Sequence, residues 1–92
     1  MDRDTIRRIQ TRLAELGHYH DEIDGMRGDN THAAVRLALT ALATGVPADW
    51  PDWSEKRQTI GFYQHFCLSK GIDAGPIDGW WGPQADHADW AL

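Results

Sequence analysis

The chain has 92 residues, of which 41% are hydrophobic and 25% are charged, and its formal net charge is −5. A chain of this length forms one small domain that buries roughly 60–65% of the surface exposed in its unfolded form. Its few, scattered Lys and Arg residues argue against a nucleic-acid-binding protein. No apolar run approaches the roughly 20 residues that a membrane-spanning helix needs.

The first predicted helix lies before Gly17. Apolar residues recur there at the spacing of one helix face, namely Ile6, Ile9, Leu13 and Leu16. Asp2 or Asp4 can cap the start of this helix. Gly17 follows the last apolar residue, where many helices end in a left-handed conformation.

The next segment contains the phrase IDGMRG at residues 23–28. An Asp-Gly pair favours a turn, because Asp caps its own backbone and Gly adopts a positive φ without strain. We expect Ile23 to anchor this loop in the core. Gly28 then precedes a second helix, in which Asp29 complements the helix dipole at the first turn.

A linker follows at residues 44–54. It contains two prolines, one glycine and two tryptophans, a composition that argues against a helix. We expect Trp50 or Trp53 to pin this linker to the core.

The second half of the chain follows the plan of the first. A helix is predicted before Gly71, with an apolar face formed by Ile60, Tyr63, Phe66, Cys67 and the stem of Lys70. Asp52 and Glu55 have the spacing of a capping box at its start. The phrase IDGWWG follows at residues 77–82, with Ile77 as the expected core anchor, and Pro83 is suited to begin a last helix.

Aligning Gly25 with Gly79 without gaps reveals an internal duplication. The identical pairs are Arg3/Arg57, Thr5/Thr59, Ile6/Ile60, Gln10/Gln64, Gly17/Gly71, Ile23/Ile77, Asp24/Asp78, Gly25/Gly79, Gly28/Gly82 and Ala34/Ala88. The sequence therefore predicts an all-α fold, a small helical bundle of four main helices built from two helix–loop–helix repeats around one core. Residues 1–92 form a single domain, with repeat one at 3–43, the linker at 44–54 and repeat two at 55–92.

The repeated pattern resembles the peptidoglycan-binding domain family, whose motif reads Gln-x-x-Leu-x-x-x-Gly, then Asp-Gly-x-aromatic-Gly-x-x-Thr-x-x-Ala-Val. Repeat one supplies Gln10, Leu13, Gly17, Asp24, Gly25, Gly28, Thr31, Ala34 and Val35, and repeat two supplies Gln64, Gly71, Asp78, Gly79, Trp81, Gly82 and Ala88. The sequence departs from the motif at Arg27, which replaces the aromatic residue, and at Ala85 and Asp89. Members of the family are small three-helix modules attached to enzymes that cut bacterial cell walls, many of them bacteriophage and bacterial lysins.

This resemblance implies a non-catalytic module that binds peptidoglycan and targets a lytic enzyme or phage lysin to the bacterial cell wall. We expect a monomer with peptidoglycan as its partner, no nucleic-acid or membrane partner, and a covalently linked catalytic domain beyond Leu92. The N-terminus has no signal-peptide pattern, so we expect synthesis in the cytoplasm followed by release or association with a virion. The alternative is a protein–protein interaction or structural module without wall binding.

The ligand-binding surface is predicted on the two loops, at residues 18–27 and 73–81. The candidate contact residues are Tyr19, Arg27 and Trp80, together with His18, Asp24 and Asp78. Aromatic faces can stack on sugars or apolar groups, and an Arg can pair bidentately with a carboxylate of the stem peptide. Trp81 occupies the family's aromatic position, so we expect it in the core and Trp80 at the surface.

No metal or cofactor is expected. An EF-hand loop needs a bidentate Glu at its last position, where the two loops have Thr31 and Ala85. His18, His20 and Asp21 include a His-x-His pair, but spacing fixes no third zinc ligand.

Catalysis by this chain is not expected either. A glycosidase needs two carboxylates across a cleft, whereas Asp24 and Asp78 are each explained by a turn. Cys67 aligns with Leu13 of the first helix, so we expect a packing residue rather than an activated thiolate.

Overall fold

The computed structural model describes residues 2–42 and 45–83. It contains three α-helices, α1 (Arg3–Glu15), α2 (Asp29–Ala41) and α3 (Glu55–Ser69), and a short 3-10 helix η1 (Trp50–Asp52). The all-α prediction is confirmed, since the described residues include no strand. The predicted helix after Pro83 falls almost wholly outside the described residues. No helix in the described ranges is long and apolar enough to cross a membrane.

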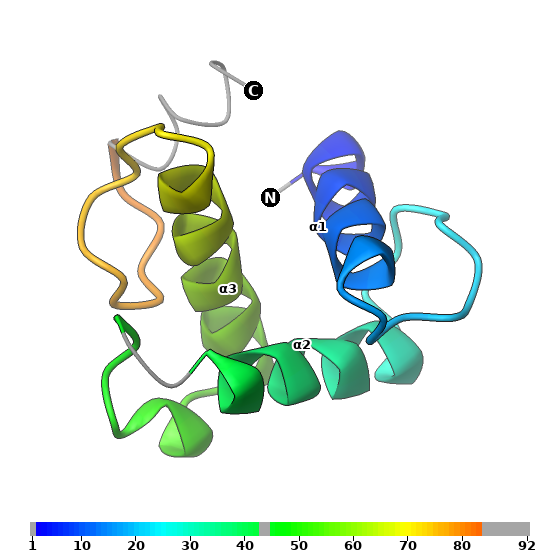
Figure 1. The fold of residues 1–92 in the computed structure, drawn as a ribbon, viewed down its shortest axis with the longest axis horizontal. Coiled ribbons are helices and arrows are strands. Elements are labelled where there is room, and N and C mark those ends of the chain that lie inside the picture. The colour runs from blue at the N-terminus through cyan, green and yellow to red at the C-terminus, as the bar shows by residue number, and fades with distance from the viewer. Residues whose placement is uncertain (1, 43–44, 84–92) are drawn as a thin grey trace.

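Helix α2 runs crosswise to α1 and α3 and packs against both (Figure 1). The core lies between these three helices, and each repeat contributes to it. Its buried members are Ile6, Ile9, Leu13, Tyr19, Ala34, Val35, Ala38, Leu39, Phe62, Tyr63, Phe66, Cys67 and Ala74. Helix α2 covers apolar side chains of both α1 and α3. This packing stabilises the fold, because hydrophobic stabilisation grows with the apolar area removed from water.

The starts of α1 and α3 are set by local side-chain caps. Of the two candidates, Asp2 and Asp4, it is Asp2 that accepts a hydrogen bond from the Thr5 amide, at 2.9 Å. The prediction of an Asp52 cap for α3 is wrong: Ser54 accepts the hydrogen bond from the Arg57 amide at 3.2 Å instead. Asp52 is the last residue of η1, and this extra turn moves the start of α3 along the chain.

The helix ends of the two repeats match. Gly17 and Gly71 have φ values of +81° and +76°, as predicted for left-handed termini. The next residue in each repeat donates a hydrogen bond to a carbonyl in the last turn, from His18 to Leu13 and from Ile72 to Cys67, both at 2.9 Å. Helices α1 and α3 therefore end in the same glycine-dependent motif.

The linker is held to the core by its tryptophans, as expected. Trp53 is buried, and Trp50 is half-buried and packs against the core. The buried Gln58 lies within reach of the Trp50 and Trp53 carbonyls, at 3.3 and 3.1 Å. The described part of this linker forms one 3-10 turn and no α-helix. The proline at the second position of η1 has no amide hydrogen to donate to a longer helix.

Three expectations about apolar residues need correction. Ile23 is 42% exposed, so it does not anchor the first loop; Tyr19, 5% exposed, enters the core in its place. Leu16 is 40% exposed because it caps α1, where the helix face turns towards solvent. Ile77 is only half-buried.

Candidate functional site

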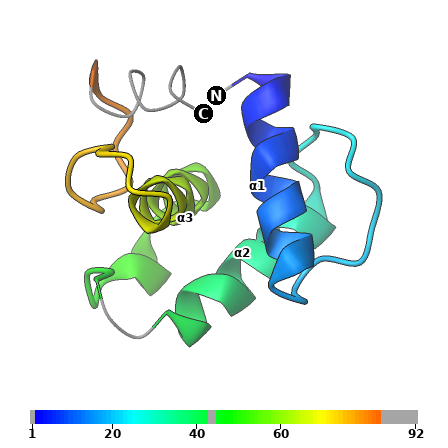
Figure 2. The same ribbon diagram turned by 45° about the horizontal axis from the view of Figure 1, so that its top comes forward.

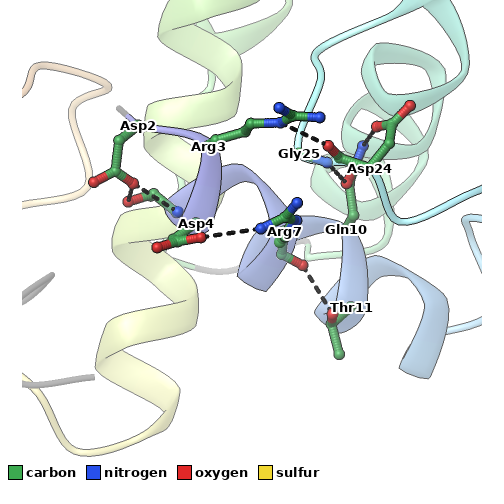
Figure 3. A network of polar contacts seen from close by, with 9 residues as sticks. Asp2, Arg3, Asp4, Arg7, Gln10, Thr11, Asp24 and Gly25 are labelled. Carbon is green, nitrogen blue, oxygen red and sulfur yellow. Dashed lines mark hydrogen bonds and ion pairs between the residues drawn. The ribbon is translucent and has the colours of Figure 1, made fainter.

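A buried glutamine organises the Asp-Gly turn of repeat one (Figure 3). The Gln10 side chain accepts a hydrogen bond from the Gly25 amide at 2.9 Å, and its amide nitrogen lies 3.1 Å from the Asp24 carboxylate. Arg3 donates from Nε to the Asp24 carbonyl at 3.1 Å. The Asp24 carboxylate also accepts a hydrogen bond from the Met26 amide at 2.9 Å. Backbone groups of three successive turn residues, Asp24, Gly25 and Met26, are therefore hydrogen-bonded to side chains.

Repeat two contains the same network. Gln64 accepts from the Gly79 amide at 2.9 Å and donates towards the Asp78 carboxylate at 3.2 Å. Arg57 donates from Nε to the Asp78 carbonyl at 3.0 Å, and Asp78 accepts from the Trp80 amide at 2.9 Å. The residues shared by the two repeats are therefore those that hold the turn.

The turn glycines are structurally equivalent, as the sequence predicted. Gly25 and Gly79 have φ values of +76° and +77°. A Cβ atom on either glycine would lie 2.7 Å from a backbone carbonyl oxygen, that of Arg3 or of Arg57. Glycine is required here for both its conformation and its size.

Hydrogen bonding to the turn changes the acidity of Asp24. The hydrogen bond from the Met26 amide, followed by the one from Gln10, lowers the pKa of the Asp24 carboxyl below its ordinary value. Asp24 and Asp78 are both half-buried, and one carboxylate oxygen of each serves its turn. These two predicted contact residues thus have a clear structural role.

The two loops lie on opposite sides of the molecule, with the three helices between them (Figures 1 and 2). The prediction that both loops form one binding surface is therefore wrong. A sequence repeat establishes equivalence of structure, but only the packing of α1 and α3 against α2 decides where the loops face.

The first loop borders a hollow of about 400 Å³ lined by His18, Tyr19, His20, Asp21, Asn30, Ala33, Ala34 and Leu37. Asn30 donates to the Asp21 carboxylate at 2.7 Å, and this hydrogen bond is the main cause of a lowered Asp21 pKa. Among the described residues, no three His, Cys, Asp or Glu side chains gather as metal ligands. The polar groups that line the hollow can form hydrogen bonds.

Tyr19 does not present the exposed face that was predicted. The side chain is 5% exposed, and its hydroxyl donates to the Glu22 carbonyl at 2.5 Å and accepts from Gln10 at 3.3 Å. A polar tip that bonds to the loop's own backbone lets the aromatic body fill the core. His18 is half-buried in this loop and Arg27 is exposed.

The second loop presents Trp80, which is 61% exposed as predicted. One face of its indole ring covers the Arg57 guanidinium, whose Cζ lies 4.3 Å from the ring centroid. Trp81 is half-buried and stacks on Tyr63 with ring centroids 5.6 Å apart, in agreement with the predicted core position. Adjacent tryptophans therefore have opposite roles, one in the core and one at the surface.

The residues in contact with Trp80 were not predicted from the sequence. Arg57 also contacts a second indole ring, because its Cζ is 4.2 Å from the Trp53 ring centroid. Trp53 in turn packs on Gly61, where an added Cβ would lie 2.9 Å from the ring. A glycine inside a predicted helix was the available signal, since it often marks close packing.

Comparison of the chain with protein-family models, with curated proteins and with solved structures gave no match. The functional interpretation therefore depends on the geometry of the two loops. Of these, the second combines an exposed aromatic face with fixed positive charge.

Proposed function

We propose that the chain is a non-catalytic module that binds bacterial peptidoglycan through its second loop. The observation that supports this function best is Trp80, a large aromatic side chain that is mostly exposed yet held over Arg57. An exposed aromatic face that is already immobilised loses little conformational entropy when it stacks on a sugar or a peptide. The sequence resemblance to peptidoglycan-binding domains supports the same function.

The net charge of −5 gives no general attraction to anionic wall polymers. We therefore propose weak binding by the isolated module, with tethering to a lytic partner domain raising its effective affinity.

Pull-down with purified peptidoglycan tests this function. We expect the wild-type chain to sediment with the wall, and Trp80→Ala to weaken binding by about 1–3 kcal/mol, as for an interface anchor. The matched control is Met26→Ala, at the equivalent position of repeat one, which is also 61% exposed. Equal binding by both variants would show that this surface is wrong, and no wild-type binding would refute the proposed function in favour of a protein-interaction module.

A further inference from the structure

Arg57, in the first turn of α3, is held by contacts with the linker and the second loop. Its Cζ lies 4.2 Å from the Trp53 ring centroid and 4.3 Å from the Trp80 ring centroid, and its Nε donates to the Asp78 carbonyl. Trp53 cannot move towards α3, because it already contacts Gly61. An Arg stacked on aromatic rings keeps its charge and its planar fork of donors while losing most of its rotational freedom.

The Nη1 and Nη2 groups at the outer edge of the Arg57 guanidinium form no hydrogen bond with a described residue. An Arg side chain has five N–H donors, and only the one on Nε is engaged by a residue in the described ranges 2–42 and 45–83. No carboxylate of these residues forms an ion pair with Arg57; the nearby Asp78 carboxylate bonds to Gln64 and to the Trp80 amide. Within these ranges, the four donors on Nη1 and Nη2 form no hydrogen bond, as a ligand-binding Arg requires.

A hollow of about 260 Å³ adjoins Arg57. It is lined by the aliphatic and aromatic groups of Ile60, Trp80 and Trp81 and by the polar groups of Ser54, Lys56 and Arg57. Two of its lining residues are cationic and none is acidic. The other three described hollows each include at least one Asp. In an acidic protein, this combination selects for a negatively charged ligand with a small apolar part.

We infer that Arg57 binds the free carboxylate of a short peptide, whose small apolar side chain occupies the adjoining hollow. A planar carboxylate matches the Arg fork bidentately, and the exposed Lys56 adds a second positive charge. This inference rests on the proposed function for the source of the peptide, which is the peptide stem of the wall rather than its glycan.

Repeat one provides an internal control. Arg3 makes the same Nε hydrogen bond, to the Asp24 carbonyl at 3.1 Å. However, Met26 replaces Trp80, and Arg7 replaces the glycine that admits Trp53. Arg3 is exposed, and no aromatic ring among residues 2–42 and 45–83 covers its guanidinium as Trp53 and Trp80 do that of Arg57.

The test is a titration of the full chain with N-acetyl-D-alanyl-D-alanine and with its C-terminal amide, followed by tryptophan fluorescence and by amide NMR shifts. We expect the acid to bind at least about tenfold more tightly than the amide, because only the acid offers a charged bidentate acceptor. Arg57→Lys retains the charge but loses the planar fork, and should weaken acid binding about tenfold. Arg3→Lys should leave it unchanged.

Equal binding of acid and amide by the wild-type chain would overturn the carboxylate site, whether or not Arg57→Lys folds. Equal losses in the Arg57 and Arg3 variants would overturn it as well. Peptidoglycan pull-down separates the two proposals. Wall binding without preference for the acid refutes the carboxylate site alone, whereas acid preference without wall binding supports that site and refutes the proposed function.

Discussion

Replacing Gly79 with Ala should destabilise the protein through two separable effects. The left-handed backbone, with φ of +77°, costs a non-glycine residue about 1–2 kcal/mol. The new Cβ would also lie 2.7 Å from the Arg57 carbonyl oxygen and 3.0 Å from the Trp53 ring. Overpacking of this kind costs about 1–3 kcal/mol. The sum is about 2–5 kcal/mol, a large share of the stability of a small domain.

The control is Gly71→Ala. Gly71 has nearly the same φ, +76°, but nothing lies within 4 Å of an added Cβ. It should therefore show the backbone cost alone, about 1–2 kcal/mol. Thermal and urea unfolding of both variants measure the difference, and each kcal/mol should lower the Tm by about 4–8 °C in a domain of this size. Equal destabilisation by the two substitutions would refute the argument that close packing, and not only φ, requires glycine in the turn.

Further predictions concern the core, pH and cooperativity. Gln10→Leu should cost about 2–4 kcal/mol in chemical denaturation, because it leaves the Gly25 amide buried without its acceptor. Burial, and then the charge of Arg12, lower the pKa of His65 below 6.5, so protonation is less favourable in the folded state. Stability should therefore be full above pH 6.5 and fall as the pH drops through the folded-state pKa, a step that His65→Gln removes from a Tm-against-pH profile. A fragment of residues 1–45 should not melt cooperatively in calorimetry, because α2 loses its packing against α3; a transition at the Tm of the whole chain would contradict this.

Local sequence signals identified the helices and their ends. The glycines at positions 17 and 71 and the cap at Asp2 depend on interactions within a few residues, so the sequence suffices to predict them. The cap of α3 was misassigned to Asp52, because the capping-box spacing with Glu55 did not take account of Ser54. Only the 3-10 turn of the linker decides between them.

The candidate site was predicted in part. Packing of Trp81 was expected from the resemblance, which puts it at the family's aromatic position, and exposure of Trp80 was expected because it is adjacent to Trp81. The burial of Tyr19 could not be predicted from its position in the loop, because a tyrosine in a loop can face solvent or fill the core. Its hydroxyl finds a partner in the loop backbone, and this contact is visible only after folding.

The sequence by itself determined the repeated turn. Its duplication of Gln, Asp and Gly at fixed spacing encodes one hydrogen-bond network twice, and such a network is local to a helix and the loop beside it. Tertiary structure alone decided that the loops face opposite sides, and that Trp53, Arg57 and Trp80 come together. These three residues join the linker, α3 and the second loop, and contacts between separate segments depend on how the helices pack rather than on the residues nearest in the chain.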